Sequence, residues 1–245
     1  MPRTPDVAIL CGGMGTRLRS VLGERPKVLA EVDGRPFLDF LIETIVAQGF
    51  QRIVLCTGQG RDQIRRHVSG QTYGAEVLFS EETSPLGTGG ALRLCRPHIQ
   101  TDRLLLLNGD SYTDLPLDAF CRMGDGSHRI QLAVVPAHGR DDAGNVNVNE
   151  QGLVTGFHEK SPGTAPGYIS AGIYLIPRAQ LEAIPGMEPC SIEYDLMPEW
   201  VRSPGVTAVI AATEVVDIGT PERLMAAGQK LWVHDRGAGG DSAAG

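Results

Sequence analysis

The sequence predicts an α/β fold built on a largely parallel, doubly wound sheet. Apolar runs of strand length alternate with helical patterns through the first half of the chain, and this alternation is typical of such sheets. The run RLLLLN at 103–108 is continuously apolar, as expected for a strand that is covered on both faces. The length of 245 residues suits one large α/β domain or two small ones.

Each element is predicted from its own local pattern. The predicted strands are 6–10, 52–57, 75–79, 103–108, 130–135, 153–158, 168–176, 206–211 and 214–217. The helix within PFLDFLIETIVAQG has the clearest signals, because a proline lies in its first turn, an apolar stripe follows, and Gly49 ends it. The other predicted helices are 15–22, 60–69, 88–96, 115–123, 192–202 and 221–235.

The second half of the chain adds to the same domain. Short strands and loops around 137–170 are interpreted as an insertion on the same sheet. We therefore predict one domain over 1–235. The remaining residues, 236–245, read RGAGGDSAAG, a low-complexity composition that predicts a disordered tail.

Composition excludes several classes of function. The net charge of −7 argues against nucleic acid or an anionic membrane as the main partner. The chain has no apolar stretch of membrane-spanning length and no signal-peptide pattern in MPRTPDVAIL, so we predict a cytoplasmic protein. Its five cysteines form no CxxC pair, which disfavours a zinc site or a disulfide framework. Cys11 is interpreted as a small residue in a tight turn and not as a nucleophile.

A glycine-rich turn follows the first predicted strand. The stretch LCGGMGTRL at 10–18 joins this strand to a predicted helix, and such a turn can bind an anion through outward-facing backbone N–H groups. Neither familiar version fits. The dinucleotide fingerprint GxGxxG requires glycine where Leu18 stands, and the chain contains no GxxxxGK[ST]. The turn is therefore a phosphate cradle of another kind or only a tight turn.

The residues that follow favour the phosphate cradle. The segment TRLRSVLGERPKVL holds four cations and one acid, so it forms a positive island in an acidic chain. Lysine is rare, with 19 arginines and three lysines (Lys27, Lys160 and Lys230). Where a lysine occurs, a compact ammonium group is expected to matter. A triphosphate needs both backbone donors and cations, and both are present here.

Two aspartates are candidate metal ligands. Asp110 follows the apolar run at 103–108, and Asp217 follows Val215 and Val216. Ligands of open α/β sheets bind outside the carboxyl ends of strands, and Mg²⁺ prefers carboxylate oxygens. Each aspartate alone is also compatible with a local turn, Asp110 in an Asx-type turn and Asp217 before the helix that Thr220 and Pro221 would start.

Six motifs occur in an order that resembles a known family. They are GGxGTRL with Lys27 ten residues after Arg17, PLGTGGAL at 85–92, LLLNGDSY at 105–112, GFHEKSP at 156–162, ISAGIYLI at 169–176 and VVDIGTPERL at 215–224. Together they resemble the sugar-phosphate nucleotidyltransferases, and most of all those that act with GTP on D-glycero-α-D-manno-heptose 1-phosphate. The resemblance implies a Rossmann-like domain with a mixed, mostly parallel sheet flanked by helices. It also implies Mg²⁺-dependent transfer of a nucleotidyl group from a nucleoside triphosphate to a sugar 1-phosphate, with release of pyrophosphate.

The resemblance also assigns roles to residues. It implies that Arg17 and Lys27 bind the triphosphate and stabilise the transition state, and that Asp110 and Asp217 bind Mg²⁺. The implied nucleotide contacts are Leu10, Gly12, Gly13, Gly15, Thr16, Glu82, Gly87 and Thr88. The implied sugar-phosphate contacts are Gly144, Glu159, Lys160 and Ser170. Two departures leave the sugar open, since Ser170 replaces the usual asparagine and Ala143 replaces a common aromatic residue.

The base is predicted from Glu82, which the resemblance places at the base-reading position. A carboxylate only accepts hydrogen bonds, and guanine offers N1–H and N2–H₂ as adjacent donors. Uracil and thymine offer a single N3–H between two carbonyls, which glutamine would suit better. We therefore predict GTP, with a uridylyl- or thymidylyltransferase acting on a hexose 1-phosphate as the alternative. Glu82 on a solvated loop is the structural alternative.

Two other classes of function are disfavoured by the sequence. A regulator that binds nucleotide sugars without catalysis is disfavoured by the joint presence of Arg17, Lys27, Asp110 and Asp217. A dehydrogenase that uses NAD is disfavoured by the failed GxGxxG pattern. The sequence leaves open whether the protein is a monomer or a homo-oligomer.

Overall fold

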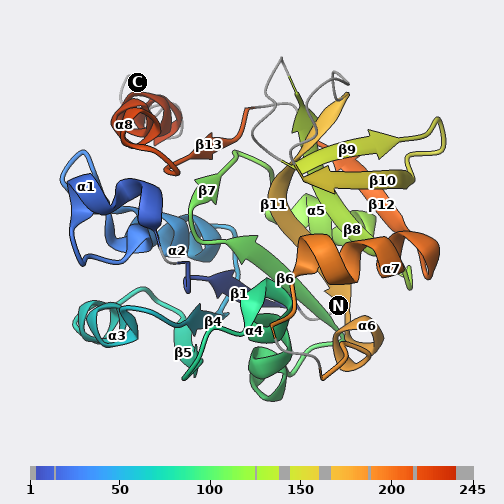
Figure 1. Cartoon of the computed structure of the whole chain (residues 1–245), viewed down its shortest axis with the longest axis horizontal. Helices are drawn as coiled ribbons and strands as arrows, with labels where there is room; N and C mark the ends of the chain where they lie inside the picture. Colours follow the sequence, from blue (N-terminus) through green and yellow to red (C-terminus); the bar gives the residue numbers. More distant parts are fainter. Residues whose placement is uncertain are drawn as a thin grey trace, which may run out of the picture.

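The computed structural model describes residues 4–13, 15–124, 126–137, 144–159, 167–186, 189–211 and 214–235. In this part of the chain a nine-stranded sheet forms the centre of the molecule (Figure 1). Its strands are β1 (Asp6–Leu10), β4 (Arg52–Thr57), β5 (Glu76–Glu81), β6 (Arg103–Asn108), β8 (Ile130–Pro136), β9 (Gly144–Val148), β10 (Val154–Glu159), β11 (Tyr168–Pro177) and β12 (Val206–Ile210).

The sheet is mixed and mostly parallel, as predicted. Strands β5, β4, β1 and β6 are neighbours in this order and all run parallel. Strand β11 runs antiparallel to β6, and β8 runs antiparallel to β11 and parallel to β12. Six of these seven strands therefore point in one direction. The β9–β10 hairpin joins the edge of β11, so the residues around 144–159 belong to the same sheet.

Helices cover both faces of the sheet. One face packs against α2 (Phe37–Ala47), α3 (Arg61–Ser69) and α5 (Leu117–Met123). The other packs against α4 (Gly87–Cys95), α6 (Arg178–Glu182) and α7 (Met197–Arg202). In β6, Leu105 and Leu107 belong to the first core and Leu104 and Leu106 to the second. Burial on both sides explains the continuous apolar run.

A third core attaches the last helix. Helix α8 (Pro221–Asp235) packs Leu224 and Leu231 against Phe37 and Leu41 of α2, next to Leu18. The short helix α1 (Arg19–Leu22) lies on the same side of the molecule (Figure 1). Among the described helices, none combines the length and the apolar character that a membrane crossing requires.

Several small elements differ from the sequence-based expectation. The predicted helix 15–22 is a 3₁₀ turn at Thr16–Leu18 followed by α1, and the predicted helix 192–202 begins as a π-helical turn at Ile192–Leu196 before α7. Two-residue strands were not predicted at β2 (Glu31–Val32), β3 (Arg35–Pro36) and β7 (Ser111–Tyr112). The predicted strand 214–217 is reduced to β13 (Val216–Asp217). The predicted tail, 236–245, lies outside the described residues.

A short antiparallel ladder joins two distant parts of the chain. Strand β13 pairs with β7 so that Asp217 lies opposite Ser111, and the Ile218 N–H donates to the Asp110 carbonyl at 3.0 Å. We call this pairing of β7 with β13 the strap. It brings residues 110–112 and 216–218 side by side beyond the carboxyl end of β6, where ligands of such sheets bind.

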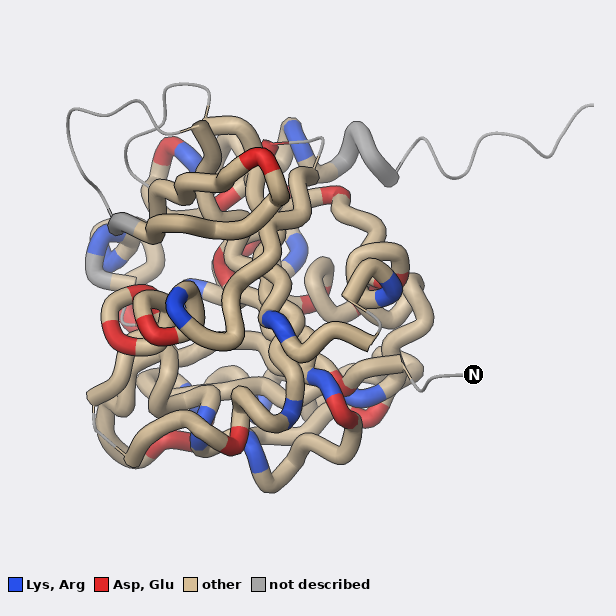
Figure 2. Tube along the Cα trace, turned by 90° about the vertical axis from the view of Figure 1, so that its right-hand side faces the viewer, with Lys and Arg blue, Asp and Glu red and all other residues tan. Residues whose placement is uncertain are grey.

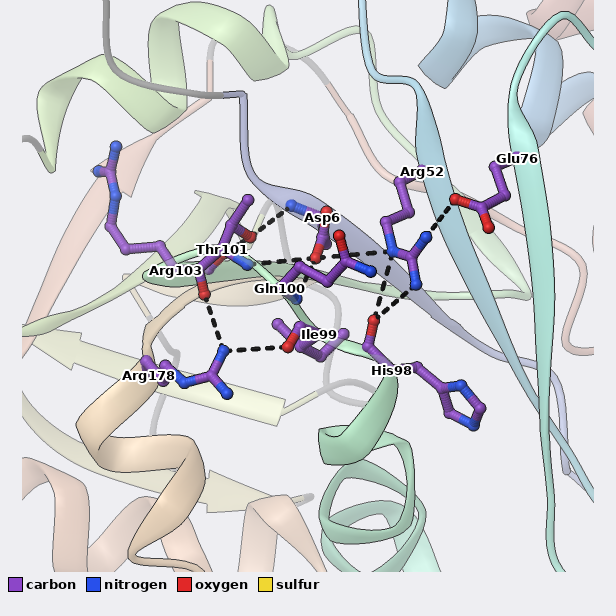
Figure 3. Close-up of polar contacts among 9 residues, drawn as sticks. All are labelled: Asp6, Arg52, Glu76, His98, Ile99, Gln100, Thr101, Arg103 and Arg178. Atoms are coloured by element: carbon purple, nitrogen blue, oxygen red, sulfur yellow. Dashed lines mark hydrogen bonds and ion pairs between the residues drawn. The ribbon is translucent and has the colours of Figure 1, made fainter.

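A polar cluster lies at the other end of the parallel strands, where β1 and β4 begin (Figure 3). The buried Asp6 carboxylate accepts hydrogen bonds from the backbone N–H groups of Gln100 (2.5 Å) and Thr101 (3.3 Å), and its own N–H donates to Thr101 Oγ1 at 2.8 Å. The Arg52 guanidinium lies 3.9 Å from the same carboxylate and donates to the His98 carbonyl. These contacts tie the starts of β1 and β4 to the loop before β6.

Charged residues are interspersed over the described chain. In the view of Figure 2, Lys and Arg segments lie among Asp and Glu segments along the tube. With a net charge of −7, a site for an anion must be built from a local group of cations.

Candidate active site

The glycine-rich turn leaves β1 directly above the sheet. The Cys11 N–H donates to the Cys56 carbonyl at 2.8 Å, and the Leu18 N–H donates to the Gly15 carbonyl at 2.9 Å. Gly15 has a φ of +55°, a backbone conformation that favours glycine. Because a 3₁₀ turn follows instead of a long helix, the helix dipole contributes little. Anion binding here depends on backbone N–H groups and nearby cations.

The structure brings most of the predicted residues into two adjoining cavities. One, of about 380 Å³, is lined by Gly13, Gly15, Arg17, Lys27, Asp110, Gly144, Ser170 and Asp217, among others. The other, of about 330 Å³, is lined by Leu10, Gly12, Gly13, Lys27, Glu82, Gly87, Thr88 and Asp110, among others. We call the first the sugar-phosphate-side cavity and the second the nucleotide-side cavity, after predicted residues that line only one of them. Gly15 and Arg17, predicted for the triphosphate, line the first as well, and Lys27 and Asp110 line both.

For two further predicted residues the structure describes only the backbone, and a third lies outside the described residues. Thr16 lies in the 3₁₀ turn, and Glu159 ends β10 with its backbone opposite Gly144. Lys160 lies outside the described residues, as does Ala143.

Asp217 lies in the strap and Asp110 directly precedes it, and each aspartate is paired with a cation. Lys27 Nζ lies 2.6 Å from Asp110 Oδ2. Arg223 Nη1 lies 3.2 Å from Asp217 Oδ1, which also accepts the Gly219 N–H at 3.0 Å. The Asp110 side chain is 42% exposed and the Asp217 side chain 16%, so Asp110 is the more open of the two carboxylates.

Gly109 allows Asp110 to take this position. Its N–H donates to the Leu10 carbonyl at 3.0 Å, and a β-carbon at Gly109 would lie 2.5 Å from that oxygen. The close approach of the two backbones excludes a side chain. The sequence NGD therefore turns sharply at the end of β6 and directs Asp110 into the boundary between the cavities.

The donor set fits Mg²⁺. The carboxylates of Asp110 and Asp217, which line one cavity, are hard oxygen ligands, and Mg²⁺ is commonly held by one or two carboxylates with phosphates and waters completing the shell. Among the residues that the structure describes, no group of three or more His, Cys, Asp or Glu could hold a metal ion. A Mg²⁺ ion on Asp110 and Asp217 would therefore take its other ligands from substrate and water.

Glu82 lies at the back of the nucleotide-side cavity. Its Oε2 accepts the Leu86 N–H at 3.2 Å, and Arg61 Nη1 donates to its carbonyl at 2.9 Å. A β-carbon at Gly58 would overlap the Glu82 carboxylate, so glycine is needed for the side chain to lie there. Burial raises the pKa of Glu82, and the hydrogen bond from Leu86 offsets part of this rise. The carboxylate is thus partly desolvated and faces the cavity.

Sequence reasoning missed Asn108, Glu193 and Arg223, which line the sugar-phosphate-side cavity. Glu193 Oε2 accepts hydrogen bonds from the hydroxyls of Thr88 and Ser191, each at 3.0 Å. Because Glu193 lies on a π-helical turn, the sequence around it shows no helix or strand periodicity that would mark it. Arg223 lies within the motif VVDIGTPERL, in which Asp217 was the only predicted site residue.

Strand β11 bends where it meets the cavity. Its pairing with β8 shifts between Ser170 and Tyr174, and Gly172 has a φ of +72°. A β-carbon at Gly172 would lie 2.6 Å from Asn108 Nδ2, and the Gly172 N–H donates to Ser170 Oγ at 3.1 Å. The bulge therefore fixes Ser170 and Asn108 relative to each other.

Cys11 is a structural residue in the geometry of the turn. Its side chain is buried, and burial together with the charge of Asp110 raises the pKa of the thiol. A buried thiol with a raised pKa is inert at neutral pH, in agreement with the interpretation of Cys11 as a small residue of the turn.

Comparison with known proteins gives consistent matches. The family model described as "Nucleotidyl transferase" matches residues 7–232. The D-glycero-alpha-D-manno-heptose 1-phosphate guanylyltransferase of Campylobacter jejuni is 33% identical over 214 residues, which cover 87% of this chain and 94% of the relative. The mannose-1-phosphate guanylyltransferase catalytic subunit beta of Drosophila melanogaster is 30% identical over 226 residues, which cover 89% of this chain and 60% of the relative.

Solved structures agree in fold. The crystal structure of HddC from Yersinia pseudotuberculosis complexed with GMP-PN is similar, with a TM-score of 0.83 and 31% sequence identity. The match covers 93% of this chain and all of that one.

Proposed function

Because this chain belongs to the nucleotidyl transferase family, we propose that it transfers a guanylyl group from GTP to a sugar 1-phosphate and releases pyrophosphate. The observation that carries the proposal is the pair of adjoining cavities that share Lys27 and Asp110. A reaction between two phosphate compounds needs two binding sites that meet at one point. Relatives that are heptose and mannose 1-phosphate guanylyltransferases support the choice of GTP and sugar.

The chemistry requires positioning more than proton transfer. A phosphate monoester has its second pKa near 6, so the sugar 1-phosphate is largely dianionic at neutral pH. One of its oxygens attacks the α-phosphorus of the triphosphate, the bond from this phosphorus to the bridging oxygen breaks, and pyrophosphate leaves. The protein must hold two anions together and neutralise the charge that develops on the leaving group.

Residues at the cavity boundary are assigned these tasks. Lys27 lines both cavities and is proposed to bind the α-phosphate. Arg17 lines the same cavity as Gly13 and Gly15 and is proposed to stabilise the departing pyrophosphate, while the glycine turn donates backbone N–H groups to the triphosphate. Lys160 and Glu159 are proposed for the sugar phosphate and the sugar hydroxyls, as the family resemblance implies.

Asp110 and Asp217 are proposed to hold Mg²⁺. When bound, the ion would supply positive charge to the phosphate oxygens around the reacting phosphorus. Glu82 is proposed to accept from N1–H and N2–H₂ of guanine, because its carboxylate faces the nucleotide-side cavity from the end of β5. We also propose a cytoplasmic location, as the sequence predicts.

A grid assay tests the proposed function. Purified protein with Mg²⁺ is incubated with GTP, ATP, CTP, UTP or dTTP and with α-D-mannose 1-phosphate, D-glycero-α-D-manno-heptose 1-phosphate or α-D-glucose 1-phosphate. Pyrophosphate release is measured for each pair. We expect GTP to give the highest kcat/KM with the heptose or the mannose compound. A preference for UTP or dTTP would contradict the assignment of the base, and no release from any pair would contradict the enzyme assignment.

A further inference from the structure

Arg223 occupies an unfavourable place for a cation. It lies in the first turn of α8, where the helix dipole favours negative charge. Its backbone N–H donates to Thr220 Oγ1 at 3.3 Å, so the helix start is capped without its side chain. The side chain instead extends to Asp217 and into the cavity that holds Arg17 and Lys27. A role for this guanidinium is therefore expected at the cavity and not in the helix.

The site contains two parallel ion pairs. Lys27 is paired with Asp110, and Arg223 with Asp217. The strap places Asp217 opposite Ser111, next to Asp110 in the chain, and all four side chains line one cavity, where their charges sum to zero. In this arrangement Lys27 and Arg223 are each bound to a carboxylate.

The proposed metal ligands change this balance. A divalent cation on Asp110 and Asp217 would neutralise both carboxylates and so weaken the ion pairs that Lys27 and Arg223 form with them. Two positive charges would then face the cavity together with Arg17. Anionic substrate would replace the carboxylates as the partner of both cations.

Lys27 and Arg223 differ in the cavities that they line. Lys27 lines both the nucleotide-side cavity of about 330 Å³ and the sugar-phosphate-side cavity. Among the described residues, Arg223 lines the sugar-phosphate-side cavity and a neighbouring one of about 300 Å³ that continues towards α8. Gly144 and Ser170, predicted for the sugar phosphate, line the same cavity as Arg223, as do Gly15 and Arg17, predicted for the triphosphate. The sugar 1-phosphate is therefore within reach of Arg223.

We propose that Arg223 binds the phosphate of the sugar 1-phosphate, and that its ion pair with Asp217 holds it back until Asp217 is neutralised. This inference rests on the proposed function, from which it takes the substrate. A guanidinium suits the task because its fork of N–H donors matches phosphate oxygens. The alternative is that Arg223 only orients Asp217 and never touches substrate.

The test uses Asp217→Asn, a variant that lacks the negative charge of Asp217 and so mimics its neutralisation when no metal ion is present. In buffer that contains EDTA, binding of α-D-mannose 1-phosphate and of D-glycero-α-D-manno-heptose 1-phosphate is measured by titration calorimetry. Four proteins are compared: wild type, D217N, R223M and the double variant D217N/R223M. Arg122→Met serves as a matched control, because Arg122 forms a 2.6 Å pair with Asp118 on the exposed surface of α5.

If the proposal is right, D217N binds one of these sugar phosphates about tenfold more tightly than wild type without metal. This gain disappears in D217N/R223M, and R122M binds like wild type. The expected size follows from one charge-assisted hydrogen-bond pair to phosphate. Equal affinities of D217N and D217N/R223M would overturn the proposal, because the gain would then be a general effect of lost negative charge. Binding no tighter in D217N than in wild type, or no binding to any variant, would also overturn it.

Steady-state kinetics distinguish the proposed role of Arg223 from the proposed guanylyltransferase function. At saturating Mg²⁺ and GTP, R223M should raise the KM for the sugar 1-phosphate about tenfold and change the KM for GTP less than about twofold. If Arg223 only orients Asp217, R223M would instead raise the Mg²⁺ concentration needed for half-maximal rate. A wild-type protein that binds the sugar phosphate as expected in calorimetry but turns over no pair of substrates would refute the proposed function and leave the assignment of Arg223 intact.

Discussion

Arg17 is exposed at the rim of the sugar-phosphate-side cavity, a position from which it can meet a leaving group. We expect Arg17→Ala to lower kcat by about 100-fold, since removal of one positioned electrostatic group costs this much in other enzymes. The KM for GTP should rise much less, because the charge on pyrophosphate develops only in the transition state. Steady-state kinetics with pyrophosphate release measure both. An effect on KM alone would show that Arg17 only anchors the bound triphosphate.

Glu82 provides a test of base recognition. Inosine triphosphate keeps N1–H but lacks the 2-amino group, so wild type should use it with a lower kcat/KM than GTP, because one buried acceptor stays unpaired. Glu82→Gln should narrow this difference, since its amide can no longer accept from both donors with a negative charge. Competition assays with the two nucleotides measure the ratio. An unchanged ratio in the variant would exclude contact between Glu82 and the base.

We expect the difference in stability between Glu82→Gln and wild type to depend on pH. Burial raises the pKa of Glu82 above the ordinary 4.5, so its ionised form disfavours the folded state. The contribution of Glu82 to the free energy of unfolding of wild type is therefore fully present below about pH 4.5, and it is lost as the pH rises through the raised pKa. The Tm of Glu82→Gln relative to wild type should increase over this range. This measurement shows whether the variant is folded when its specificity is compared.

At the scale of elements, the bulge in β11 offers a matched pair of glycines. Gly172 and Gly152 have nearly the same φ, +72° and +75°, but a β-carbon would meet Asn108 only at Gly172 and open space at Gly152. We expect Gly152→Ala to reduce the free energy of unfolding by about 1 kcal/mol through backbone strain. Gly172→Ala should reduce it further and also lower kcat/KM, because Asn108 must move. Denaturant unfolding and kinetics on both variants check this, and equal effects would contradict a role for the bulge in the site.

The elements also show what sequence could and could not predict. Strands such as 103–108 and the helix 221–235 were predicted because apolar periodicity and capping residues are local signals. Asp110 and Lys27 were predicted as site residues because glycine turns and strand ends mark ligand sites in α/β folds, and both line the two cavities. Glu193 was missed, since its place in the site depends on the contact of its π-helical turn with Thr88. The strap was missed because each of its strands has only two residues, which are too few to show a periodic pattern. The two strands also lie far apart in the sequence.

On the scale of the whole molecule, a buried polar cluster and the candidate site lie at opposite ends of the parallel strands. The polar cluster around Asp6 lies where β1 and β4 begin (Figure 3), while both cavities of the candidate site open where β1 and β6 end. We expect Asp6→Asn to reduce the free energy of unfolding by about 1–3 kcal/mol, because buried donors lose a charged acceptor. The variant should keep the wild-type kcat/KM at a temperature where it is folded.

A surface variant controls for the loss of a carboxylate as such. Asp118→Asn breaks an exposed pair with Arg122, and exposed pairs contribute little, so its urea midpoint should stay close to that of wild type. If Asp6→Asn lowers kcat/KM while the protein remains folded, the two ends of the parallel strands are coupled and their separation into stability and function is wrong.

The strap has a consequence for the way the protein is made. Asp110 leaves the ribosome well before Asp217, and the ladder between β7 and β13 can form only after both have emerged. A nascent chain that has already folded the β1–β4–β6 half of the sheet therefore holds the glycine turn and Lys27 but only one of the two carboxylates. The proposed pair of metal ligands is completed only after residues 216–218 have been synthesised, so we expect the order of translation to delay metal binding until the β7–β13 ladder has formed.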